Sequence, residues 1–157
     1  MIKGIWHTSF TVKNIEETIK FYRDILGLDL VHTQVQNNEY TRKLVGYDDA
    51  HLNVAMFTIS GLSASPSGHV LEFVEYVNPP GEYIPVGTAH TRSAHVAFVV
   101  SDIHALVERL REVNVTFKSE VVSIKEGINK GGFTIYFLDP DGITLEFVQP
   151  PENREVS

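Results

Sequence analysis

The chain contains no cysteine, and this absence excludes disulfides, thiolate nucleophiles and cysteine metal sites together. It has no run of Lys and Arg, and its formal net charge is -7, so neither a nucleic-acid nor an anionic-membrane partner is expected. The longest apolar run, residues 96–100, is far too short to cross a bilayer, and the N-terminus has no apolar signal core. A cytoplasmic location is therefore the default expectation.

The composition is that of a folded globular protein. Hydrophobic residues make up 43% of the 157 residues and charged residues 21%, so intrinsic disorder is expected only at the ends. This length suits one compact domain or two small fused modules.

An internal repeat favours two modules. The pattern His-x-x-Phe-x-Val begins at His7 and again at His95, an offset of 88 residues (95 − 7). A second motif, Leu-Glu-Phe-Val, occurs at residues 71–74 and again at 145–148. Each half therefore opens with a histidine and closes with a glutamate in related contexts, which is the signature of a duplicated unit.

Both halves show the same order of expected elements. Alternating apolar residues predict strands, a 3.6-residue apolar period predicts helices, and Asn14 and Asp102 are suitable helix N-caps. Gly27 is expected to end the first helix, and residues 139–142 form a turn between the last two strands. The expected strands are 4–12, 28–36, 51–60 and 68–77 in the first half, and 94–101, 115–124, 132–138 and 143–149 in the second, with a helix at 103–112. The sequence thus predicts an α+β fold of two tandem βαβββ modules.

Prolines and glycines mark the boundary between the modules. The expected division is a first module at 1–78, a linker at 79–92, a second module at 93–150 and a tail at 151–157. The loops at 60–68 and 125–132 are expected to border the substrate cavity, the first as a lid or merely as a long turn.

The alternation of side chains along strands gives the candidate site. On each opening strand the Phe and Val of the repeat face the helix, and His7 or His95 faces the other way. On each closing strand the Leu and Phe face the helix, and Glu72 or Glu146 points oppositely. If the two sheets curl toward each other, two imidazoles and two carboxylates converge.

These four side chains are the predicted ligands of one divalent metal. Two imidazoles with two carboxylates suit Zn²⁺, Ni²⁺, Fe²⁺ or Mn²⁺, whereas Ca²⁺ prefers oxygen ligands alone. A single strand histidine is more often a core or surface residue than a ligand, and a lone glutamate is usually solvated. The metal hypothesis therefore depends on the joint pattern, because all four residues stand at repeat-equivalent positions.

Three stretches of the sequence resemble the vicinal oxygen chelate superfamily, which includes glyoxalase I, epimerases, extradiol dioxygenases and resistance proteins. They are residues 18–28 (TIKFYRDILGL), 94–98 (AHVAF) and 139–146 (DPDGITLE). The His/Glu/His/Glu set is most similar to that of bacterial glyoxalase I. Three features depart from that enzyme: the loop at 60–68 is longer, its asparagine after the first glutamate is displaced to Asn78, and Asp24, with Arg23 beside it, stands where it has a basic glutathione-contacting residue.

The resemblance implies an enzyme that moves a proton next to a carbonyl through a metal-bound enediolate, as a glyoxalase-type lyase or an isomerase. Glu146 or Glu72 would transfer the proton, and the substrate would be a small molecule with adjacent oxygens. Asn129 and Lys130 are candidate substrate contacts. An Fe²⁺ extradiol-type dioxygenase and a small-molecule-binding resistance protein remain alternatives. Related proteins often pair modules across subunits, which implies a homodimer.

Overall fold

The computed structural model describes residues 1–62 and 69–152. The chain forms two compact units, Met1–Ile84 and Pro85–Ser157. Most of the expected loop at 60–68 and of the expected tail lie outside the described residues. The assignment of residues 79–92 as a linker stays a prediction.

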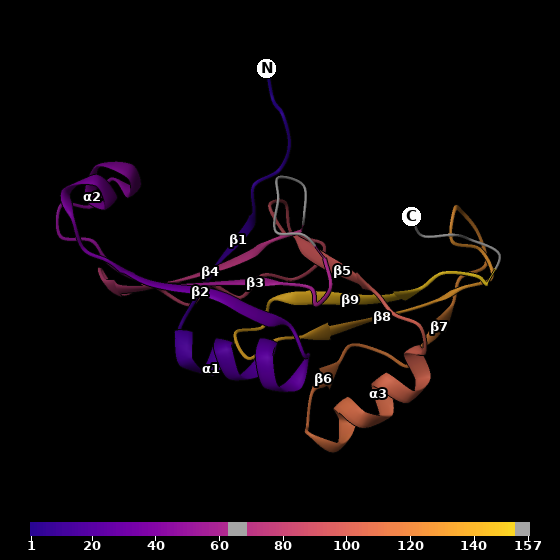
Figure 1. The fold of residues 1–157 in the computed structure, drawn as a ribbon. Coiled ribbons are helices and arrows are strands. Elements are labelled where there is room, and N and C mark those ends of the chain that lie inside the picture. Colours follow the sequence, from indigo (N-terminus) through magenta and orange to yellow (C-terminus); the bar gives the residue numbers. More distant parts are fainter. Residues whose placement is uncertain (63–68, 153–157) are drawn as a thin grey trace. The chain divides into compact units, whose positions relative to one another are not determined.

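The first unit contains one four-stranded sheet. Its strands run in the order β1-β4-β3-β2, with β1 parallel to β4 and the other pairs antiparallel. Figure 1 shows α1 along one face of this sheet and α2 beyond its end. The elements are β1 (Thr8–Val12), α1 (Ile15–Ile19), the π-helix η1 (Lys20–Ile25), β2 (Asp29–Gln36), α2 (Glu39–Val45), β3 (His51–Thr58) and β4 (Leu71–Asn78).

The second unit repeats this arrangement. Its sheet has the order β5-β9-β8-β6, with β7 also paired to β8, and β5 is parallel to β9. Helix α3 lies along one face of the sheet (Figure 1). The elements are β5 (His95–Val99), α3 (Ile103–Glu112), β6 (Thr116–Phe117), β7 (Val122–Ser123), β8 (Phe133–Leu138) and β9 (Thr144–Gln149). The predicted α+β class with two curled mixed sheets is therefore confirmed.

The predicted helix caps are confirmed. The Asn14 side chain accepts a hydrogen bond from the Glu17 amide, and the Asp102 side chain accepts one from the Ala105 amide, each at 3.0 Å. Each bond satisfies an amide at the start of a helix that has no partner within the helix. The two caps therefore define where each helix begins after its opening strand.

Each unit buries aromatic rings between its helix and its sheet. In the first, Tyr22 contacts the rings of Phe57 and Phe73, with centroid distances of 5.9 and 4.2 Å. In the second, Phe137 stacks on Phe147 at 4.2 Å. These rings occupy the helix-facing positions of β3, β4, β8 and β9, so the alternate positions of the same strands face away from the helix.

In each unit a side chain of the closing strand accepts a hydrogen bond from the first backbone amide of the helix. The Glu75 side chain accepts a hydrogen bond from the Ile15 amide at 3.3 Å, and the Gln149 side chain accepts one from the Ile103 amide at 2.8 Å. The two acceptors are three residues after Glu72 and Glu146 respectively, so the repeat extends to this contact. It links the helix to the strand that carries the candidate site.

We expect Gln149→Ala to lower the free energy of unfolding by about 1 kcal/mol, because it removes a part-buried hydrogen bond. Urea unfolding followed by circular dichroism measures this. Glu120→Ala is the matched control, since its ion pair with Arg111 is exposed and such pairs contribute little. Equal stability of the two variants would contradict the role of Gln149.

The structure departs from the expected elements most clearly in three places. The first strand begins at Thr8 rather than at residue 4, and the strand expected at 115–124 is split into β6 and β7. Helix α2 was not predicted at all; Asn38 caps it and Gly46 ends it with a φ of 78°. No helix of the described residues is long and apolar enough to cross a membrane.

Candidate metal centre

The first unit brings His7 and Glu72 together. The Thr8 amide donates a hydrogen bond to the Val70 carbonyl, and Thr8 pairs with Leu71 in the register of β1 with β4. His7 precedes β1, and its Nε2 lies 3.4 Å from Oε1 of Glu72. The imidazole and the carboxylate therefore meet on the face of the sheet opposite α1.

The second unit brings His95 and Glu146 together in the same way. His95 pairs with Thr144, so Glu146 is two residues further along β9 and on the same face. The Nε2 atom of His95 lies 3.1 Å from Oε2 of Glu146. The structure thus places the four predicted residues as two equivalent His–Glu pairs, one in each unit.

Both glutamates are largely withdrawn from water. The side chains of Glu72 and Glu146 are 19% and 16% exposed. A carboxylate in such a position needs compensating partners, since burying unpaired charge is costly. The His7 ring is also incompletely satisfied, because its Nδ1 is buried with no hydrogen-bond partner among the described residues. Among the described residues, the pair of His7 and Glu72 therefore retains a buried polar atom, Nδ1 of His7, without a hydrogen-bond partner.

The separations within the pairs suit two ligands of one metal ion. Nitrogen and oxygen ligands lie about 2.0–2.2 Å from Zn²⁺, so two of them at tetrahedral or right angles are about 2.8–3.6 Å apart. The observed 3.4 and 3.1 Å fall in this range. Within residues 1–62 and 69–152 no group of three or more His, Asp or Glu side chains could hold a metal ion. A complete ligand set would accordingly need more than one pair.

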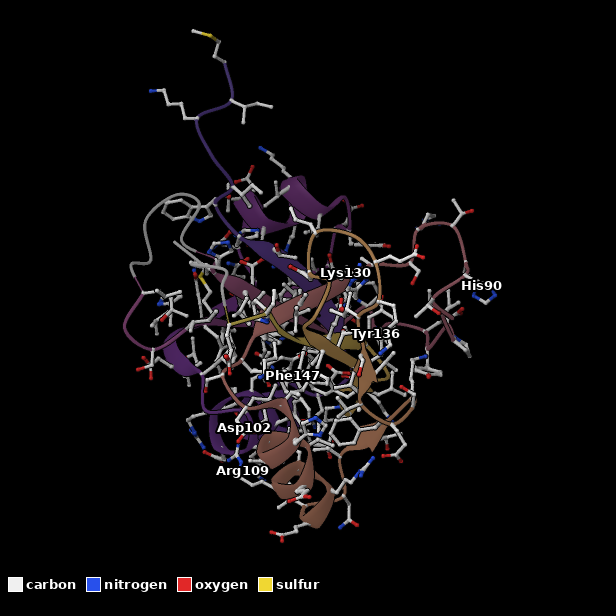
Figure 2. All side chains as sticks on the ribbon, turned by 90° about the vertical axis from the view of Figure 1, so that its right-hand side faces the viewer. His90, Asp102, Arg109, Lys130, Tyr136 and Phe147 are labelled. Carbon is white, nitrogen blue, oxygen red and sulfur yellow. The ribbon has the colours of Figure 1, made fainter. Side chains whose placement is uncertain are left out.

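Two residues of β8 surround Glu146. The Thr134 hydroxyl donates a hydrogen bond to Oε1 of Glu146 at 2.6 Å, which leaves Oε2 toward His95. Tyr136 is opposite Glu146 across the strands, and its ring meets the His95 ring edge-on at 5.2 Å. Burial, and secondarily the charge of Glu146, raises the pKa of Tyr136, so its phenol stays protonated at neutral pH. Figure 2 shows Tyr136 on the sheet, Asp102 at the N-cap of α3 and Arg109 on α3.

The equivalent positions of the first unit are apolar. Val54 pairs with Val74 as Thr134 pairs with Val148, and Met56 pairs with Glu72 as Tyr136 pairs with Glu146. Neither Val54 nor Met56 can donate a hydrogen bond to a carboxylate. The two glutamates therefore differ on this side: the Thr134 hydroxyl of β8 bonds Glu146, whereas the equivalent side chains of β3 beside Glu72 are apolar, and the hydroxyl opposite Glu72 is that of Ser9 on β1.

We expect Thr134→Val to weaken zinc binding by roughly 10–100-fold, the usual cost of losing a group that orients a ligand. Competition with a chromophoric chelator measures the dissociation constant. Thr116→Val is the control, because Thr116 is an exposed residue of β6 in the same sheet. Unchanged zinc affinity in Thr134→Val would show that the hydroxyl does not organise a ligand.

The remaining candidate residues have different surroundings. Glu75, three residues after Glu72, points to the helix-facing side and accepts a hydrogen bond from the Ile15 amide. Lys130 is exposed in the loop before β8, and Asn129 beside it accepts a bond from the Gly132 amide through its carbonyl. Their substrate role stays a prediction. His90 accepts a bond from the Gly87 amide through Nδ1, and Figure 2 shows it on a loop away from Tyr136.

Sequence reasoning missed Thr134 and Tyr136. A signal for them exists in the alternation of β8: they alternate with the buried Ile135 and Phe137, so they share the face of Glu146. Assigning them to Glu146 also requires the strand register, which the sequence does not state.

Comparison with known proteins agrees with this architecture. Residues 4–147 match the Glyoxalase/Bleomycin resistance protein/Dioxygenase superfamily. The chain is 30% identical to a lactoylglutathione lyase of Haemophilus influenzae, over 92% of this chain and 91% of the relative. It is 26% identical to a 2-epi-5-epi-valiolone epimerase of an Actinomyces species, over 94% of this chain and 80% of the relative.

A solved structure supports the fold. A glyoxalase family protein from Bacillus cereus superposes with a TM-score of 0.81 at 19% identity, covering 96% of both chains. Because the family match spans most of the sequence and the sheet topology is duplicated as described, the chain belongs to the Glyoxalase/Bleomycin resistance protein/Dioxygenase superfamily.

Proposed function

We propose that this protein is a metal-dependent enzyme that transfers a proton at a carbon next to a carbonyl, as a lyase or an epimerase. The observation that carries the proposal is the pair of His–Glu contacts at equivalent register in the two units. Relatives named as a lyase and an epimerase support the reaction class.

His7, Glu72, His95 and Glu146 would together hold one divalent cation, which we propose to be Zn²⁺, Ni²⁺, Fe²⁺ or Mn²⁺. When bound, such a metal polarises substrate oxygens as a Lewis acid and so acidifies the neighbouring C–H bond. The donor set fits this role, since neutral imidazole nitrogen and carboxylate oxygen are both common ligands of these metals.

The inequality of the glutamates suggests a division of work. Thr134 restrains Glu146, which favours a positioning and ligating role for that carboxylate. Glu72 has Val54 and Met56 beside it, and we propose that its carboxylate accepts the proton from carbon and returns it. A carboxylate that changes its orientation can deliver the proton to the adjacent carbon or to the other face, giving isomerisation or epimerisation.

Deuterium exchange tests the reaction class even when the product is unidentified. Zinc-, nickel-, iron- and manganese-loaded protein is incubated in D₂O with hemithioacetals, acyl-CoA epimers, hydroxyketones and catechols, and NMR records loss of the proton next to the carbonyl. Catalysed exchange that disappears on chelation supports the proposal. Oxygen uptake with a catechol, without exchange on any ketone, would favour the dioxygenase alternative instead.

A binding protein of the resistance type gives a third result. It would retain ligand affinity after chelation and catalyse no exchange.

The homodimer and the cytoplasmic location stay predictions; analytical ultracentrifugation of the metal-loaded protein tests the homodimer.

A further inference from the structure

The edge strand β2 carries a row of polar side chains on one face. His32, Gln34 and Gln36 alternate along the strand, and their tips meet: Nε2 of His32 lies 3.3 Å from Oε1 of Gln34, which also accepts from Nε2 of Gln36 at 3.4 Å. We call these three residues the amide row. Val35, which alternates with Gln34 and Gln36, is exposed on the other face.

The amide row lies on the same face as Glu72. His32 pairs with Met56, and Met56 pairs with Glu72, so the three residues form one line across three strands. Gln34 and Gln36 follow in the next two lines, opposite Val54 and Leu52. With strands about 4.8 Å apart, the row lies roughly 10 Å from the backbone of Glu72. A substrate of six-carbon size bound at Glu72 would reach it.

The contacts within the row are weak enough to be exchanged for a ligand. Distances of 3.3 and 3.4 Å are at the long end for hydrogen bonds, and His32 and Gln34 are exposed. Between the row and Glu72 stand the apolar side chains of Met56 and Val54. The amide row can therefore form hydrogen bonds with one edge of a ligand, while Met56 and Val54 contact the C–H face of the same ligand.

The strands themselves offer no cationic side chain to an anionic ligand held on these sheets. Among the described residues, no strand of either unit contains Lys or Arg. Glutathione and acyl-CoA conjugates carry carboxylates or phosphates, which proteins bind with cationic side chains. A row of neutral donors and acceptors instead suits hydroxyl groups.

We infer that the amide row is a substrate subsite for a neutral polyhydroxylated carbonyl compound, such as a sugar or a cyclic polyol ketone. This rests on the proposed function, because it places the reacting carbon near Glu72. His32, Gln34 and Gln36 bind the hydroxyls remote from the carbonyl, and Met56 supports the ring. These residues determine specificity and take no part in proton transfer.

The test compares two ketones that differ in remote hydroxyls. Zinc-loaded wild-type protein is given scyllo-inosose or 2-hydroxycyclohexanone in D₂O, and exchange next to the carbonyl is followed by NMR. We expect kcat/KM to be on the order of 10² higher for scyllo-inosose, and Gln34→Leu to lower that value at least about tenfold while leaving 2-hydroxycyclohexanone unchanged. Thr33→Leu, an exposed position on the other face of β2, is the control and should behave as wild type.

The outcomes separate this inference from the proposed function. Exchange of 2-hydroxycyclohexanone with no preference for scyllo-inosose, or a preference that Gln34→Leu retains, overturns the subsite and leaves the proton transfer standing. Faster exchange of the anionic glutathione hemithioacetal of methylglyoxal than of scyllo-inosose also overturns it. If wild-type protein exchanges no ketone, the proposed function fails. Saturation-transfer NMR then decides the subsite: scyllo-inosose binding that Gln34→Leu abolishes supports it, and absence of binding overturns it.

Discussion

Replacing His95 with alanine is expected to weaken zinc binding by more than the roughly 10–100-fold typical of losing an outer-shell partner, because it removes one of the four proposed direct ligands. The imidazole lies 3.1 Å from Glu146, and its loss leaves that carboxylate without its histidine. The fold should persist, since the helix-facing Phe98 on the same strand is untouched. Metal analysis of protein purified without added zinc, together with a chelator titration, measures the effect.

His7→Ala should give the same loss, because His7 is the repeat equivalent in the first unit. His90→Ala is the control for both: His90 is exposed, and its Nδ1 bonds the Gly87 amide. Circular dichroism verifies that each variant is folded. Folded His7→Ala and His95→Ala proteins with wild-type zinc content would exclude both histidines as ligands.

The faces of the strands could be predicted from the sequence because a strand alternates its side chains with a period of two. One phenylalanine on each of four strands identifies the helix-facing side, and each candidate ligand is one or three residues before it: Phe10, Phe73, Phe98 and Phe147. The duplication gave a second, independent copy of the same pattern. Helix α3 was predicted with the same bounds because Ile103, Val107 and Leu110 form a buried stripe of helical period.

Helix α2 could not be found by the same reasoning. Thr41 is its one buried residue, and its apolar residues Tyr40 and Leu44 are exposed. A search for an apolar core stripe has nothing to detect in such a helix. Its signals are local: Asn38 as the cap and Gly46 in the left-handed conformation. They specify a helix without specifying what it packs against.

The residues that surround the two glutamates could not be predicted from the sequence for a different reason. Thr134 reaches Glu146 from the neighbouring strand, 12 residues earlier in the chain. Which residue of β8 lies beside Glu146 depends on register, and a shift of one residue would turn Thr134 to the other face. For the same reason, the sequence alone does not predict that Glu72, Met56 and His32 are aligned across three neighbouring strands. Repeat patterns therefore give the candidate ligands, and sheet pairing gives the residues that surround them.

Glu72→Gln is expected to lower turnover by about 10²–10⁴-fold, the usual contribution of a general base, on whichever carbonyl substrate the deuterium screen identifies. The amide keeps the size of the side chain and an oxygen that can face a metal, but it cannot accept the proton. Zinc content should therefore fall less than turnover does. Glu75→Gln is the control, because Glu75 lies on the same strand but faces α1 and bonds the Ile15 amide.

Glu146→Gln separates the two carboxylates. It should also lower turnover, but with a larger loss of zinc affinity than Glu72→Gln, because the Thr134 hydroxyl holds the carboxylate of Glu146, which we propose as a ligand, and Val54 offers no such bond to Glu72. Adding excess zinc should then restore more activity to Glu146→Gln than to Glu72→Gln. The reverse order, with Glu72→Gln rescued by zinc and Glu146→Gln inactive at full zinc occupancy, would assign the proton transfer to Glu146.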